Sequence, residues 1–171
     1  MLWIVARLSG RPESASRKKV VLAACSCASL ALTCVPEDGR PRVAIEVASA
    51  WAQGESGITL DDVHPAASDA ADAVFDAATA NAANRASPSR AAAYSAASSI
   101  SAATDASCYP SSAVAANSAS NAAHHAAAAA DFGAPNAAHD AGPSARHATL
   151  KRCADIVRQK YPTPPRWRED A

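Results

Sequence analysis

Five histidines and five cysteines are the residues of this 171-residue chain best suited to metal binding or nucleophilic chemistry. Their spacing argues against both. His124 and His125 are adjacent and Cys25 and Cys27 are two apart, so on a helix the members of each pair point to different sides. The sequence contains no C-x-x-C pair, no G-x-S-x-G and no glycine-rich phosphate loop. We therefore expect no catalytic residue, cofactor or metal site; a His/Cys metal-binding helical protein or an enzyme is the alternative.

Carboxylates are the second group that could bind a ligand. Residues 37–76 hold nine acids against two arginines, and Asp69, Asp72 and Asp76 share one face of a predicted helix. No histidine or further acid lies at helical spacing to complete a metal site. We interpret the three as a solvated face, or as part of an acidic surface for a protein partner. The candidate residues of that surface are Asp61, Asp62, Asp69, Asp72 and Asp76.

The overall charge balance narrows the classes of partner. Lysine and arginine together number 16, as do aspartate and glutamate, so the formal net charge is zero. Such a chain has no strong field to attract nucleic acid or a membrane surface, and we expect neither partner. The longest apolar run, residues 20–35, has 16 residues including serines and threonines, fewer than the roughly 20 that span a bilayer. We expect a cytoplasmic protein with free, partly buried thiols.

Alanine dominates the elements that must position these side chains. Our count gives 48 alanines, and aromatic residues make up 5% of the chain. Alanine is the best helix former and is depleted in strands, so the composition predicts an all-α fold. We expect a single-domain antiparallel array of about five to seven Ala-rich helices over residues 17–161, with an N-terminal arm (1–16) and a Pro/Arg-rich tail (162–171). The predicted helices are 17–34, 40–53, 59–85, 90–107, 112–131 and 144–160.

Periodicity and helix-breaking residues give more detailed expectations. The first helix carries an apolar stripe from Val20 to Cys34, and Trp51 should fill the core beside alanines of the second helix, which Gly54 should end. Thr59 can cap the third helix, although Pro65 suggests a start nearer His64. Further expected core positions lie on the third helix opposite its aspartates (Ala71, Val74, Phe75, Ala78 and Ala82) and along an apolar stripe of the last helix (Leu150, Cys153, Ala154, Val157 and Tyr161). Gly142-Pro143 should form a break before the last helix.

Residues 38–55 carry a more specific pattern, D-G-R-P-R-V-A-I-E-V-A-S-A-W-A-Q-G-E. This segment resembles the D-x-R-P-R-x-A-I-E-x-A-x-A-W-x-x-G-E signature of the immunity proteins of bacterial polymorphic-toxin systems, an Ala-rich helical family (immunity-five-like). Residues 21–28 and 150–158 are similar to the first and closing helices of that family. The matching motif residues are Arg40, Pro41, Arg42, Ile45, Glu46, Trp51, Gly54 and Glu55.

The resemblance implies an all-α domain that binds and neutralises a cognate bacterial toxin without catalysis. It identifies no contact residues. The motif has two physical interpretations, because Arg42 and Glu46 lie one helical turn apart after a Pro-Gly turn. It fixes how the first two helices dock, or it forms a recognition surface. If the acidic residues 37–76 make the contact, charge complementarity suggests a basic toxin such as a nuclease.

Overall fold

The protein is an all-α molecule whose helices pack side by side. The computed structural model describes residues 11, 13–34, 38–83, 111–133 and 141–163. In these residues there are five α-helices, one 3-10 helix and no strand. The elements are α2 (Ala15–Ala28), η1 (Ser29–Cys34), α3 (Gly39–Gln53), α4 (Leu60–Ala83), α6 (Ser112–Gly133) and α7 (Ala141–Lys160).

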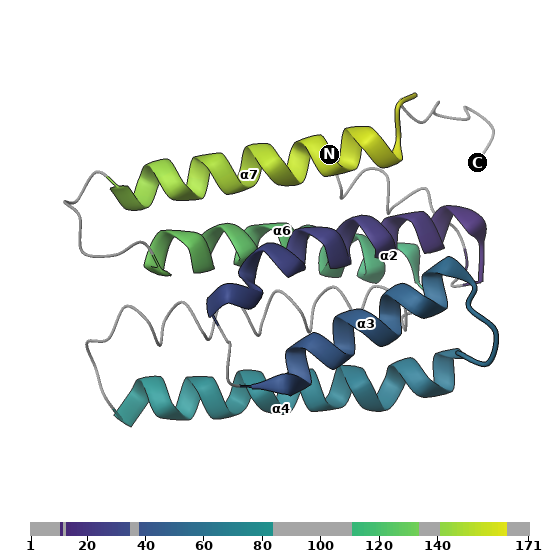
Figure 1. The fold of residues 1–171 in the computed structure, drawn as a ribbon, viewed down its shortest axis with the longest axis horizontal. Helices are drawn as coiled ribbons and strands as arrows, with labels where there is room; N and C mark the ends of the chain where they lie inside the picture. Colours follow the sequence, from purple (N-terminus) through teal and green to yellow (C-terminus); the bar gives the residue numbers. More distant parts are fainter. Residues whose placement is uncertain (1–10, 12, 35–37, 84–110, 134–140, 164–171) are drawn as a thin grey trace.

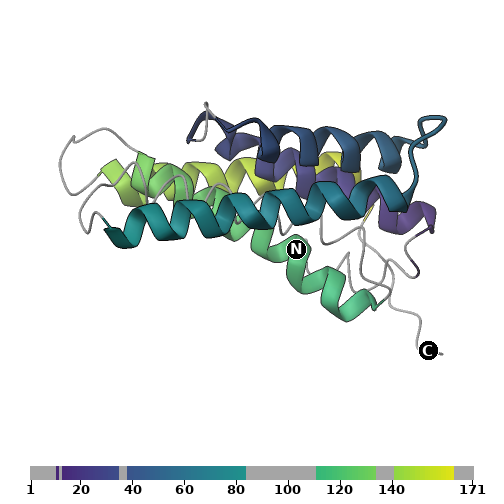
Figure 2. The same ribbon diagram turned by 90° about the horizontal axis from the view of Figure 1, so that it is seen from below.

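Helix α2 occupies the centre of the array. It contacts α3 on one side and α6 and α7 on the other, while α4 packs against α3 and α6 against α7. Figure 1 shows α7 along one edge and α4 along the opposite edge, with α2, α3 and α6 between them. Successive helices α2, α3 and α4 run antiparallel, as do α6 and α7 (Figure 1). Seen from below, α6 is inclined to the other helices (Figure 2).

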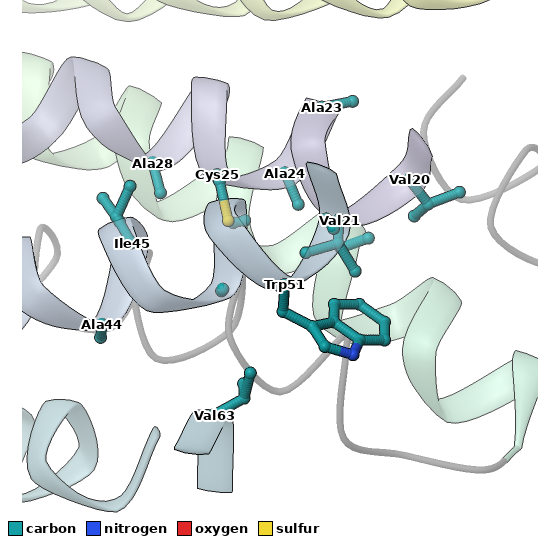
Figure 3. Packing of buried hydrophobic residues seen from close by; sticks show 14 of the residues in the cluster. Val20, Val21, Ala23, Ala24, Cys25, Ala28, Ala44, Ile45, Trp51 and Val63 are labelled. Atoms are coloured by element: carbon teal, nitrogen blue, oxygen red, sulfur yellow. The ribbon is translucent and has the colours of Figure 1, made fainter. Parts of the chain in front are cut away.

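The core consists mainly of small side chains. Val20, Val21 and Cys25 of α2 pack with Trp51 of α3 and Val63 of α4, among alanines from α2, α3, α4 and α6. Figure 3 shows the Trp51 indole between Val21 and Val63. Only 2% of Trp51 is exposed, which confirms its predicted role as a bulky filler among methyl groups. Alanine-lined faces let helices approach closely. Because each alanine buries little area, the few large side chains contribute a disproportionate share of the buried apolar area.

Helix α3 follows the prediction closely at both ends. Asp38 caps its start, with its side chain accepting the Arg40 N–H. Gly54 ends it in the left-handed conformation (φ 78°). The Gly54 N–H donates to the Trp51 carbonyl and the Glu55 N–H to the Ala50 carbonyl, each over 3.0 Å. This paired pattern is a Schellman motif, which satisfies carbonyls that the helix end would otherwise leave open.

The first helix differs from the prediction. It begins at Ala15, where Ser14 accepts the Arg17 N–H over 3.1 Å, and it tightens into 3-10 geometry from Ser29 instead of continuing as α-helix to residue 34. Two serines near this change bond back to the main chain. Ser26 Oγ donates to the Leu22 carbonyl over 2.7 Å and Ser29 Oγ to the Cys25 carbonyl over 2.8 Å. Such bonds compete with the α-helical ladder and weaken it.

The predicted later start of α4 is wrong. The helix begins at Leu60, and Pro65 lies inside it. Asp62 stabilises the early start because its carboxylate accepts the Thr59 N–H over 2.7 Å and the Thr59 hydroxyl over 2.8 Å. Pro65 has no N–H, so the Asp61 carbonyl loses the hydrogen bond that residue 65 would normally donate to it. Both residues are exposed, so a water molecule can donate to that carbonyl instead.

The predicted core face of α4 is also wrong. The buried residues are Val63, Ala66, Ala67, Ala70 and Ala73. Ala71 is exposed and Phe75 is 71% exposed; the side chains of Val74, Ala78 and Ala82 lie outside the described set. Alanine occurs on every side of this helix, so the expected face depends on the aromatic ring pointing inward. Because the ring points outward, the true core face is rotated from the predicted one by about a quarter turn.

Helix α7 begins at Ala141, so the predicted break at Gly142-Pro143 does not occur. Pro143 falls in the first turn, where its missing N–H has no intrahelical partner to lose. The prediction for 112–131 agrees with α6. The predicted helix 90–107, most of the N-terminal arm and most of the tail lie outside the described residues.

Candidate functional site

The acidic face predicted on α4 is solvent-exposed. Asp61, Asp69, Asp72 and Asp76 all lie on the outer side of the helix, opposite the buried Val63 and alanines. We call these four residues the acidic face. The fifth candidate, Asp62, is exposed too, but its bonds to the Thr59 N–H and hydroxyl lower its pKa and commit it to the start of the helix. Asp62 therefore stabilises the start of α4, a role that could not be told from the sequence, where it is one of several aspartates in this stretch.

Phe75 lies beside the acidic face. It comes directly before Asp76 in the chain and one turn after Asp72, and 71% of it is exposed. Its main-chain carbonyl accepts the Thr79 hydroxyl over 2.9 Å. A large aromatic ring left in water amid carboxylates is a feature of protein-binding surfaces, where aromatic residues supply buried contact area and charges set orientation. Sequence periodicity predicts this residue in the core and therefore misses the feature.

Arg40 links the start of α3 to the acidic face. Its Nη2 lies 2.8 Å from Asp38 Oδ2 and 2.8 Å from Asp76 Oδ2, and its Nε donates to Asp38 Oδ1 over 3.1 Å. The bonds from Arg40 lower the pKa of Asp38, and those from Asp38 and Asp76 raise the pKa of Arg40. This motif residue thus joins the second and third predicted helices, whereas the docking interpretation concerns the first and second. Asp76 therefore belongs to the acidic face and also forms an ion pair with Arg40.

The other motif residues divide between core and surface. Pro41, Ile45 and Trp51 are buried, while Gly54 and Glu55 form the Schellman motif. Arg42 and Glu46 are exposed. The structure therefore places part of the motif in the packing of α3 and leaves the charges of Arg42, Glu46 and Glu55 on the surface.

A second feature is a cavity between α6 and α7, with a volume of about 270 Å³. Its wall includes Ser120 and His124 of α6 and Leu150, Cys153 and Val157 of α7. His124 and Leu150 lie at its rim, whereas Cys153 and Val157 are buried at its floor. No sequence pattern indicates this cavity, because residues 124 and 153 come together only through the antiparallel packing of the two helices.

Cys153 lies next to a second buried cysteine, Cys27, which is not among the residues that line the cavity. Cys27 of α2 is buried, and its Sγ donates to the Cys153 carbonyl over 4.0 Å. The interaction between the two side chains, followed by burial, raises the pKa of Cys27. The same interaction lowers the pKa of Cys153 against the opposing effect of burial, and the nearby Arg152 lowers it further.

Cys25 provides a contrast two residues from Cys27. It points toward α3 (Figure 3), and burial raises its pKa to about 12, partly offset by a hydrogen bond with Ser49. The two neighbouring cysteines therefore face different helices, as their spacing predicted. Cys25, Cys27 and Cys153 are free thiols.

The His/Cys metal-binding alternative concerns the same part of the molecule. Among the described residues, no group of three or more histidine, cysteine or acidic side chains is arranged to hold a metal ion. His124 and His125 stack edge to face with ring centroids 5.6 Å apart, and burial, followed by the charge of His124, lowers the pKa of His125. Nor does any described helix combine the length and apolarity that crossing a bilayer requires.

One buried charge is not expected from the sequence. The side chain of Arg17, in the first turn of α2, is fully buried, and burial lowers its pKa. It lies in the part of the chain that the sequence assigns to the beginning of the first helix. A basic residue before an apolar stripe is typical of a surface position, so nothing in the pattern distinguishes it.

Comparison with known proteins adds no relative. The chain matches no protein-family model, and neither the curated proteins nor the solved structures contain a significant match.

Proposed function

We propose that this protein is a non-catalytic binding protein that neutralises a cognate bacterial toxin by binding and blocking it with the outer side of α4. The observation that carries the proposal is the exposure of Phe75, 71% of which is in water beside the acidic face. The nature of the partner comes from the resemblance of residues 38–55 to immunity proteins. The chemistry of the surface favours a basic partner, because carboxylates attract complementary charge.

The geometry of α4 supports this assignment of roles. The helix buries one side against α3 and the core and leaves the other to solvent, so a partner can reach Phe75, Asp69 and Asp72 without unfolding anything. An aromatic ring transferred from water into a partner's pocket supplies affinity, whereas exposed carboxylates mainly accelerate and orient the encounter. Asp76 has less freedom, since it also binds Arg40.

The proposal is tested by capturing the partner and then changing the surface. The full chain is used as bait in lysate of its native host, and bound proteins are identified by mass spectrometry. We expect a basic protein with a toxin domain in near-equimolar amount. With that protein purified, Phe75→Ser should weaken binding about tenfold or more, because a buried aromatic anchor is lost. Asp69→Lys with Asp72→Lys should slow association and reduce its dependence on salt.

Asp155→Lys is the matched control, because it reverses an exposed acid on α7, at the edge of the array opposite α4 (Figure 1). It should leave affinity nearly unchanged. Equal binding by wild type, Phe75→Ser and the double lysine variant would contradict the proposed surface. A captured partner that binds through this surface but is not toxic to cells would contradict the proposed function and leave the proposed surface standing.

A further inference from the structure

We propose that Cys153 and Cys27 form a redox-active thiol pair that a small hydroperoxide, entering the cavity between α6 and α7, oxidises to a disulfide joining α7 to α2. The chemistry is independent of toxin binding. It involves a cavity and two thiols that the surface of α4 does not use.

The cavity supplies access to an otherwise buried sulfur. Cys153 is 3% exposed, yet it lines the floor of a space of about 270 Å³ that is partly open to solvent. A water molecule occupies about 30 Å³ of liquid, so hydrogen peroxide or a small alkyl hydroperoxide fits within the cavity. Ser120 and His124 on the α6 side offer hydrogen-bonding groups to the peroxide oxygens.

The second thiol lies where a resolving cysteine is needed. Cys27 Sγ is 4.0 Å from the main-chain oxygen of Cys153, although the two residues are 126 positions apart in the chain. Cys27 is completely buried, so it has no direct path to an oxidant in solvent. The interaction of the two side chains lowers the pKa of Cys153 and raises that of Cys27, which makes Cys153 the better nucleophile.

The reaction balances in two steps. The Cys153 thiol ionises, and its thiolate attacks the terminal peroxide oxygen; the O–O bond breaks, the hydroxyl stays on sulfur as a sulfenic acid, and the leaving alkoxide or hydroxide takes up the proton that the thiol released, forming an alcohol or water. The Cys27 sulfur then attacks the Cys153 sulfur, the S–O bond breaks, and the thiol proton departs with the hydroxyl as water. Two thiols are oxidised to one disulfide, and one hydroperoxide is reduced to an alcohol and water.

Treatment of the reduced full chain with hydrogen peroxide tests the pair. After non-reducing proteolysis and mass spectrometry, we expect a Cys27–Cys153 linked peptide as the main oxidised product. Cys27→Ala should stop at the sulfenic acid, which dimedone traps on Cys153. Cys153→Ser should leave Cys27 reduced under the same conditions, because the buried thiol has no access to the peroxide.

Cys25→Ala is the matched control, since Cys25 is a buried thiol on the same helix that faces α3. It should form the Cys27–Cys153 disulfide as readily as wild type. Circular dichroism of each variant identifies any that fail to fold. The proposal is overturned if the folded wild type forms no such link, or if the linked peptides have the same distribution in folded protein and in protein oxidised after unfolding in urea.

Discussion

Asp38 shows how one carboxylate can perform two tasks at the residue scale. It caps α3 by accepting the Arg40 N–H over 3.0 Å, and it binds the Arg40 guanidinium through both of its oxygens. The same guanidinium reaches Asp76 of α4. The capping role is visible in the sequence as an acid before Gly-Arg-Pro, whereas the link to Asp76 depends on how two helices pack.

This arrangement predicts a pH dependence. The bonds from Arg40 place the folded-state pKa of Asp38 below its unfolded value of about 3.9. The carboxylate therefore contributes stability above pH about 4 and loses it as the pH falls through the lower folded-state pKa. Asp38→Asn keeps a capping oxygen but removes the charge, so the variant should lose less stability on acidification than wild type. Thermal unfolding between pH about 7 and pH about 2 measures the difference, and Glu46→Gln serves as a control on the same helix.

Gly54 gives a second prediction at this scale. Its φ of 78° is a conformation that other residues adopt at a cost, and a Cβ added there would meet nothing within 4 Å. Gly54→Ala should therefore destabilise the protein by about 1 kcal/mol through the backbone alone. Gly39→Ala, at the open start of the same helix, should be neutral or stabilising. Urea unfolding of both variants decides the point, and equal effects at the two positions would contradict it.

At the scale of the element, the sequence predicted α3 better than α4. Trp51 beside alanines on one face and a terminal glycine point to the observed face and end of α3, and the structure adds Asp38 as the cap at its start. Helix α4 has alanine on every side and only Leu60, Val63, Val74 and Phe75 as larger apolar residues. Hydrophobic periodicity then cannot decide which way the helix turns, and the packing of its neighbours decides instead. For this reason the exposed Phe75 could not be found from periodicity, whereas the cavity beside Cys153 could not be found because it depends on how α6 and α7 pack.

The docking of α3 depends on Trp51, which gives a prediction for the element. The indole is 2% exposed, packs with valines of α2 and α4, and has its ring centroid 5.1 Å from Lys18 Nζ. Trp51→Ala should cost about 3–5 kcal/mol, because alanine neighbours cannot move in to fill the space. Val43→Ala removes methyl groups from a half-exposed position on the same helix and should change stability by less than about 0.5 kcal/mol. Similar unfolding midpoints for the two variants would contradict the assigned role of Trp51.

Across the whole molecule the net charge is zero, but the two surfaces described above lie at different places on the fold. Acidic residues occupy the outer side of α4, while the cavity and its paired thiols lie toward the other edge, where α6 and α7 pack together (Figure 1). In Figure 1, α2 and α3 lie between α4 and α7. A substitution on α4 is therefore expected to leave peroxide oxidation of Cys153 unchanged, and Cys153→Ser is expected to leave partner binding unchanged. The two proposals can fail or succeed separately.

The bond between Tyr161 and Ser16 has a consequence for chain connectivity. The Tyr161 hydroxyl donates to the Ser16 carbonyl over 3.0 Å across 145 positions of sequence, so the exit of α7 adjoins the entry of α2. A circular permutant can use this proximity. A short glycine-serine linker would join the end of α7 to the start of α2, and new termini would be placed at Gly57 in the exposed turn before α4. We expect the permutant to retain the helical circular dichroism spectrum and a cooperative unfolding transition. Loss of both would mean that the original order of the chain is needed for folding.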